Sequence, residues 1–92
     1  MKFNSDEYAL LETVVRSILE QEHSDAVPHD KLRIWNELLQ KLVLQQAVMG
    51  TYLHELNMQV RMYLYKNTLP DEEKNSLELL CKRMKRTSHS FR

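Results

Sequence analysis

The chain has 92 residues, and its 13 basic and 13 acidic side chains cancel, so its net charge gives no general argument for nucleic acid or anionic membranes. One glycine and two prolines leave little material for tight turns, which argues against an all-β fold, whereas Leu, Glu, Gln, Met, Lys and Arg all favour helix. The single cysteine excludes an intramolecular disulfide, and no apolar run approaches the roughly 20 residues of a membrane span. Residues 1–7 lack the basic and apolar regions of a signal peptide. We therefore expect one all-α domain over residues 1–92, located in the cytoplasm and without a cofactor.

The first predicted helix covers residues 5–22. Asn4 is placed to act as its N-cap, and Glu7 follows three residues later, as in a capping box. Phe3 and Tyr8 stand at the two positions of a hydrophobic staple. A wide apolar stripe follows along the helix, so we expect this helix to pack into a core.

A long central helix is predicted over residues 28–66. Its apolar residues recur in alternating steps of three and four, which is the pattern of a and d positions in a heptad repeat. Gln46 is the single polar member, and it would either form a register-setting pair across a dimer axis or lie at the rim of the packing. The positions that we expect in the core or at a dimer interface are Leu32, Trp35, Leu39, Leu42, Gln46, Met49, Leu53, Leu56, Val60 and Tyr63.

The length of this helix bears on how it can be covered. A helix over residues 28–66 would be about 58 Å long, whereas a compact domain of this size has a radius of gyration of roughly 12 Å. The two outer helices would fold back antiparallel, one onto each end, and a second copy of the chain would complete a dimeric helical bundle. The alternative is a break near Gly50 that gives a four-helix monomer. Because one glycine costs only about 1 kcal/mol in a helix interior, we expect an unbroken helix in which Gly50 lets another backbone approach closely at the core or dimer interface.

The third predicted helix covers residues 70–86. Asn67 in the left-handed conformation would end the central helix, and Pro70 would prevent it from continuing. Thr68 is a candidate cap, and three acids over residues 71–73 favour the positive end of the helix dipole. Residues 87–92 are expected to form a frayed basic tail.

Charge is unevenly distributed along the chain. Residues 1–46 carry five basic and eight acidic side chains, and residues 47–92 carry eight and five. The dipole of a helix favours bases at its end, but a basic end can also contact phosphates. The candidate nucleic-acid contacts are Lys82, Arg83, Lys85, Arg86 and Arg92.

Residues that could carry chemistry are few. Glu20 and His23 form half of a ferritin-like Glu-x-x-His pair, but no second copy exists, so we expect no metal site. Arg16 and His23 have an Arg-x6-His spacing that resembles the active-site motif of HEPN-type helical ribonucleases, and this resemblance implies a helical ribonuclease as a third functional hypothesis. His54 lacks the second histidine of a zincin helix. Cys81 lies on an apolar stripe, which indicates a buried thiol.

Aromatic and methionine side chains gather near the end of the central helix. Met58, Met62 and Tyr65 are candidate partner-binding residues, because Tyr and Met are common at protein contacts. Taken together, the sequence predicts a non-enzymatic protein–protein interaction module, a small dimeric adaptor or regulator. Its partners would be a second copy of the chain and another protein. A nucleic-acid-associated regulator is the alternative.

Overall fold

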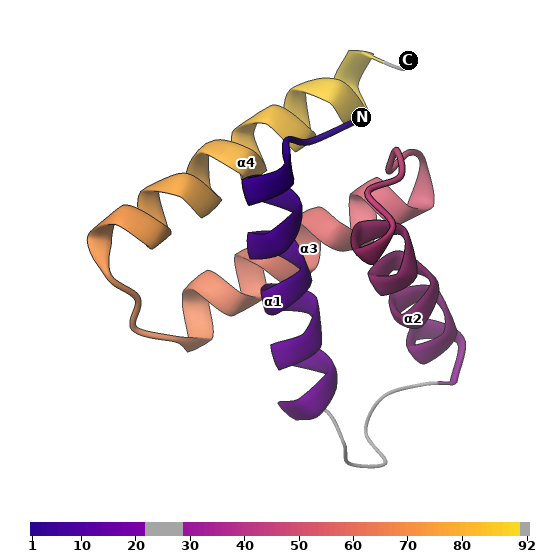
Figure 1. The fold of residues 1–92 in the computed structure, drawn as a ribbon, viewed down its shortest axis with the longest axis horizontal. Helices are drawn as coiled ribbons and strands as arrows, with labels where there is room; N and C mark the ends of the chain where they lie inside the picture. The colour runs from indigo at the N-terminus through magenta and orange to yellow at the C-terminus, as the bar shows by residue number, and fades with distance from the viewer. Residues whose placement is uncertain (22–28, 91–92) are drawn as a thin grey trace.

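Four α-helices form the part of the chain that the computed structural model describes, residues 1–21 and 29–90. They are α1 (Ser5–Gln21), α2 (His29–Val43), α3 (Thr51–Lys66) and α4 (Asp71–Ser90). Figure 1 shows α1 crossing α3, with α2 on one side of α1 and the turn between α3 and α4 on the other. No strand occurs in these residues, which confirms the all-α prediction.

The start of α1 has the predicted capping box and staple. The Asn4 backbone N–H donates to Glu7 Oε1 at 2.9 Å, and the Glu7 N–H donates to Asn4 Oδ1 at 2.8 Å. Phe3 and Tyr8 pack edge to face, with their ring centroids 5.3 Å apart. Residues 3–8 therefore fix both the start of the helix and the direction of the chain that enters it.

The prediction of an unbroken central helix over residues 28–66 is wrong, because the chain leaves the helix after Val43 and re-enters it at Thr51. The end of α2 is a Schellman motif. The Gln46 N–H donates to Lys41 O at 2.9 Å, and the Gln45 N–H donates to Leu42 O at 3.1 Å. Gln45 has a φ of 53°, the left-handed conformation that glycine or asparagine usually adopts at this position. The residue that ends α2 is therefore a glutamine, and its type does not predict the end of a helix.

Gly50 has a different role from the predicted one. It precedes α3 with φ 59° and ψ −130°, a combination that residues with a side chain rarely adopt. A Cβ atom built at Gly50 would have no neighbouring heavy atom within 4 Å. Gly50 therefore serves the backbone turn into α3, and the close approach of another backbone is not its function here.

Contacts with the start of the chain hold the linker over residues 44–50. The Tyr8 hydroxyl donates to Gln46 O at 2.8 Å. Met1 and Val48 exchange two backbone hydrogen bonds, each of 2.9 Å, and the Val48 side chain is fully buried. These contacts offset the conformational cost of the left-handed Gln45.

The break lets one chain cover its own apolar stripe. The molecule measures 34 × 32 × 24 Å, far shorter than the rod that an unbroken helix would require. The length of the central helix therefore no longer requires a second copy. The segment before α1, all four helices and the linker contribute to the buried apolar core. Among the described residues it contains Phe3, Tyr8, Leu11, Val14, Val15, Ile18, Trp35, Leu38, Leu42, Val48, Leu53, Leu56, Val60, Leu77, Leu80, Cys81 and Met84.

The connection between α3 and α4 also differs from the predicted one. Asn67 is extended, with φ −121° and ψ 143°, and is not left-handed. Its backbone N–H and its side-chain Nδ2 both donate to Tyr63 O at 3.1 Å, so the side chain helps to end α3 without a left-handed turn. The last helix continues to Ser90, beyond the predicted end at residue 86, because no glycine or proline follows Pro70 to stop it.

Candidate interaction surface

The two faces of α3 differ sharply in burial. Leu53, Leu56 and Val60 are buried against the other helices. On the opposite face Tyr65 is 93% exposed and Met58 is 45% exposed, while Met62 is partly covered. Met58, Met62 and Tyr65 are spaced by four and three residues, so they form one stripe along two turns of the helix. We call this stripe the outer α3 face.

The exposed charged side chains that α3 itself contributes are basic. His54 and Arg61 are exposed beside the stripe, and Lys66 is exposed at the end of the helix. Glu55 is the one carboxylate in α3, and it is 96% buried on the other side. The exposed part of α3 therefore combines apolar side chains with the cations Arg61 and Lys66 and exposes no carboxylate of its own.

Glu55 is held in the interior by α2. Lys31 Nζ forms an ion pair with Glu55 Oε1, and Trp35 Nε1 donates a hydrogen bond of 3.2 Å to Oε2. Burial acts to raise the pKa of Glu55. The hydrogen bonds from Lys31 and Trp35, together with the charges of Lys31 and His54, lower it by more than burial raises it, so the pKa of Glu55 lies below the ordinary value. The carboxylate thus stays charged and ties α2 to α3.

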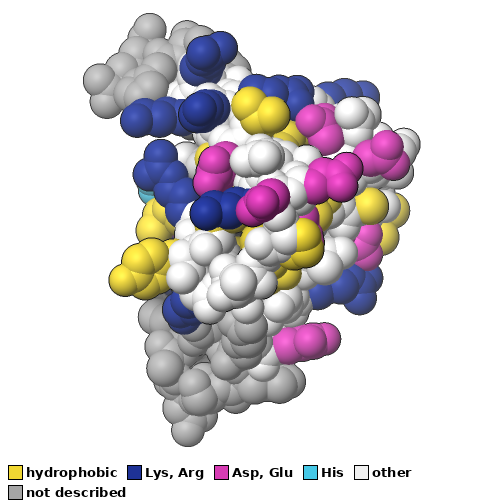
Figure 2. Space-filling model, turned by 90° about the vertical axis from the view of Figure 1, so that its left-hand side faces the viewer, with side chains coloured by type: hydrophobic (Ala, Val, Ile, Leu, Met, Phe, Trp, Pro, Cys, Tyr) yellow, Lys and Arg dark blue, Asp and Glu magenta, His cyan; other side chains and the backbone are white. Residues whose placement is uncertain are grey.

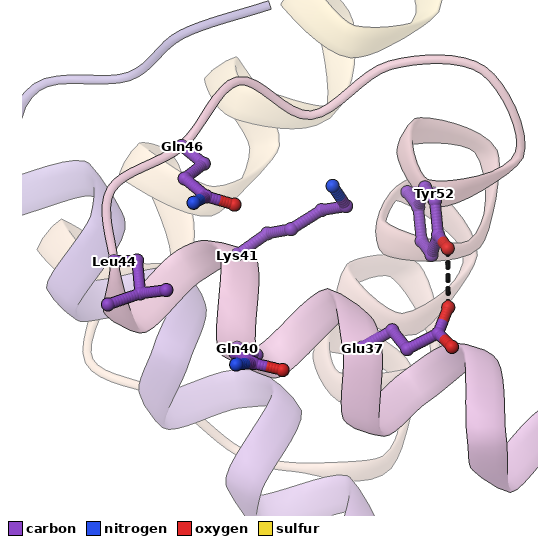
Figure 3. A pocket seen from close by; sticks show the side chains of 6 residues that line it. All are labelled: Glu37, Gln40, Lys41, Leu44, Gln46 and Tyr52. Atoms are coloured by element: carbon purple, nitrogen blue, oxygen red, sulfur yellow. Dashed lines mark hydrogen bonds between the residues drawn. The ribbon is translucent and has the colours of Figure 1, made fainter.

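A hollow of about 280 Å³ lies between α2, the linker and α3, and Figure 3 shows its lining residues. The Tyr52 hydroxyl donates to Glu37, and Lys41 Nζ lies 4.9 Å from the centre of the Tyr52 ring. The hydrogen bond from Tyr52, with one from Arg33, lowers the pKa of Glu37, and the same bond raises the pKa of Tyr52. The charged groups therefore already have partners, and none of the described residues that line the hollow is Ser, Thr, Cys or His. The lining residues are Glu37, Gln40, Lys41, Leu44, Gln46 and Tyr52.

The basic residues of α4 are not all directed to solvent. Arg83 forms an ion pair with Glu7 at 2.5 Å, and its guanidinium lies 6.0 Å from the Phe3 ring centroid. Lys82, Lys85 and Arg86 are exposed, and Arg92 lies outside the described residues. One of the predicted phosphate contacts thus helps to dock α1 on α4. Nucleic-acid binding stays a prediction.

The residues considered for chemistry are not brought together. Arg16 pairs with Glu12 at 2.8 Å on the exposed side of α1, and His23 lies outside the described residues. Cys81 is buried, and this burial raises the pKa of its thiol, while Arg61 acts to lower it and Glu78 to raise it. Within residues 1–21 and 29–90, no three His, Cys, Asp or Glu side chains are grouped so that they could hold a metal ion.

The positions predicted for the core or a dimer interface fall into three groups. Trp35, Leu42, Leu53, Leu56 and Val60 are buried within the chain, and Leu39 and Tyr63 are partly covered. The members that remain exposed are Leu32, Gln46, Met49 and Gly50.

Some surface and core residues were not singled out from the sequence. Leu79 on α4 is 62% exposed, and Leu44, directly after α2, is 57% exposed. Gln59 is fully buried, and within the described part of the chain neither its Nε2 nor its Oε1 has a hydrogen-bond partner. Gln59 lies one turn after Glu55, on the inner side of α3. Its burial could be predicted only if the orientation of α3 were already known.

Comparison of the chain with protein-family models, with curated proteins and with solved structures finds no match. None of the described helices is both long and apolar enough to cross a membrane. The functional argument therefore rests on the surface itself.

Proposed function

We propose that this protein is a non-enzymatic helical interaction module that binds another protein through the outer α3 face. The observation that carries this proposal is the exposure of Tyr65, 93%, on the same stripe as Met58 and Met62. An exposed tyrosine beside methionines provides a large contact area at low entropic cost and is typical of protein-binding surfaces. Within α3 the other apolar side chains are buried or partly covered, so this face is the part of the helix that is open to a partner.

Site-specific photo-crosslinking in the native cells tests this proposal. A photoreactive residue at position 65 should trap a defined partner, and Met58→Asp combined with that probe should reduce the trapped amount at least tenfold. Ser76, exposed on α4, is the matched control position for the probe. Equal trapping from positions 65 and 76, or no effect of Met58→Asp, would contradict the proposal.

The predicted homodimer is a second candidate, and the linker favours it. Val43, Leu44 and Met49 are 46%, 57% and 57% exposed, and they lie within seven residues of one another. A two-fold interface would cover the same patch on both copies. In this proposal the adaptor uses the linker for self-association and the outer α3 face for its partner.

A further inference from the structure

We infer that the outer α3 face binds an acidic amphipathic helix of its partner. This inference rests on the proposed function and adds the chemistry of the partner to it. The occupant follows from the shape of the stripe and from the sign of the charges beside it.

The shape of the stripe suits a helix. Met58 and Tyr65, with Met62 between them, are seven positions apart on one helix, a rise of about 10 Å at 1.5 Å per residue. A partner helix with apolar residues at i, i+3 or i+4, and i+7 presents a stripe of the same length. Methionine side chains are unbranched and adapt to the partner's side chains, and the exposed Tyr65 offers a rigid ring with a hydroxyl at its end.

The charges beside the stripe select an acidic partner. Arg61 and His54 are exposed on α3, and the single carboxylate of this helix is buried with Lys31. On the side of the α3–α4 turn, Figure 2 shows hydrophobic side chains that protrude at the left edge next to Lys and Arg, while most of the Asp and Glu side chains lie in the middle and on the right. Carboxylates flanking the partner's apolar stripe would meet complementary charge, whereas lysines there would be repelled.

Nucleic acid fits this face less well. A phosphate backbone is bound by several closely spaced cations, but Arg61 is followed directly by Met62 and Tyr63 and is one turn from Met58 and Tyr65. The apolar residues would then have no role unless bases stacked on Tyr65. An acidic amphipathic helix uses both features of the surface.

A peptide selection tests the inference with the whole protein. The probe is a displayed library of helical peptides of about 18 residues, five turns, with leucines fixed along one stripe and the flanking positions randomised. The wild-type protein should enrich Asp and Glu at the flanking positions. Arg61→Glu should lower the affinity of a selected acidic peptide at least tenfold and shift a repeated selection toward Lys and Arg. Arg61→Gln should give a smaller loss of affinity.

Arg16→Glu is the matched control, because it makes the same charge reversal at an exposed residue of α1 and should leave the selected sequences unchanged. Circular dichroism checks that each variant folds. Selected peptides without acidic enrichment, or equal effects of Arg61→Glu and Arg16→Glu, would overturn the inference while the proposed function stands. Enrichment of no peptide over a Tyr65→Ala control protein would overturn both. A doubled mass in light scattering that Tyr65→Ala returns to the monomer value would overturn the inference in favour of a second copy on this face.

Discussion

Single residues decide where the central helix breaks. Gln45 and Gly50 both have positive φ, but only Gly50 has a residue type suited to it. The chain therefore carries backbone strain at one end of the linker and avoids it at the other.

We expect Gly50→Ala to lower the free energy of unfolding by about 1–2 kcal/mol, because an alanine is strained at φ 59° and ψ −130° although its methyl group has space. Gln45→Gly should raise it by about 0.5–1 kcal/mol, since glycine adopts the left-handed conformation freely. Urea unfolding measures both variants. Effects of the same sign would show that the strain is not located where these dihedral angles place it.

Gln59 is the other residue whose environment conflicts with its chemistry. Its buried amide has no hydrogen-bond partner in the described part of the chain, and such a group costs about 1–3 kcal/mol. Gln59→Met has a similar shape and should raise the free energy of unfolding by about 1 kcal/mol. The same change at the exposed Gln40 should stay within about 0.5 kcal/mol of zero. A loss of stability in Gln59→Met would indicate that the amide is satisfied in solution, for instance by a buried water.

The pKa of Glu55 makes stability depend on pH. Because its folded pKa lies below the ordinary value of about 4.3, its contribution is fully present above that value and is lost as the pH falls through the folded pKa. The stability difference between wild type and Glu55→Gln should therefore be constant above about pH 5 and shrink below it. Urea unfolding across this range measures the difference, and the NMR titration of the Glu55 carboxyl gives the pKa directly. A midpoint above the ordinary value would mean that burial outweighs Lys31 and Trp35.

At the scale of elements, α1 and the linker stabilise each other. Residues 1–8 supply hydrogen bonds to the linker and place Phe3 against Arg83 of α4. The start of the chain thus connects the α2–α3 junction to the last helix, and α1 does more than cover one side of α3.

We expect Tyr8→Phe to lower the free energy of unfolding by about 0.5–1.5 kcal/mol, because it removes the hydrogen bond from the Tyr8 hydroxyl to Gln46 O and leaves the ring in place. Hydrogen exchange should accelerate most at the amides of Gln46 and Val48. Tyr65→Phe, at an exposed ring, is the control and should change neither stability nor exchange. Uniform acceleration throughout the chain would show that the linker has no separate opening.

At the scale of the whole molecule, the fold decides which apolar side chains are buried and which remain exposed. The largely apolar stripe of residues 28–66 is folded back on itself, and exposed apolar side chains remain on the outer α3 face, at and beside the linker, and at Leu32 of α2. The hypothesis of a dimer therefore depends on the linker and no longer on the length of a helix.

Light scattering tests that hypothesis. If the linker pairs two copies, the protein at high micromolar concentration should have twice the mass of 11.0 kDa, and Leu44→Glu should return it to the monomer. Leu79→Glu, at an exposed leucine of α4, is the matched control and should leave the mass unchanged. A monomer at that concentration would remove self-association from the proposed function.

The sequence by itself determined the features that depend on neighbours within a turn or two of helix. The all-α class, the Asn4–Glu7 capping box and the Phe3–Tyr8 staple could be predicted because each is formed by residues close in the chain. Met58, Met62 and Tyr65 could also be chosen as candidates from the sequence, but the sequence did not show how far each of them would be exposed to solvent.

Only the tertiary structure decided the path between Val43 and Thr51 and, with it, the direction in which α3 points. A glutamine in the left-handed conformation is unfavourable by local preference. It is held by Tyr8 and Met1, which lie 38 and 47 residues away from their partners Gln46 and Val48. Periodicity along the chain does not report contacts of that range. The residues predicted for one long seam are therefore divided between two helices and a linker, and the exposed face of α3 follows from that division.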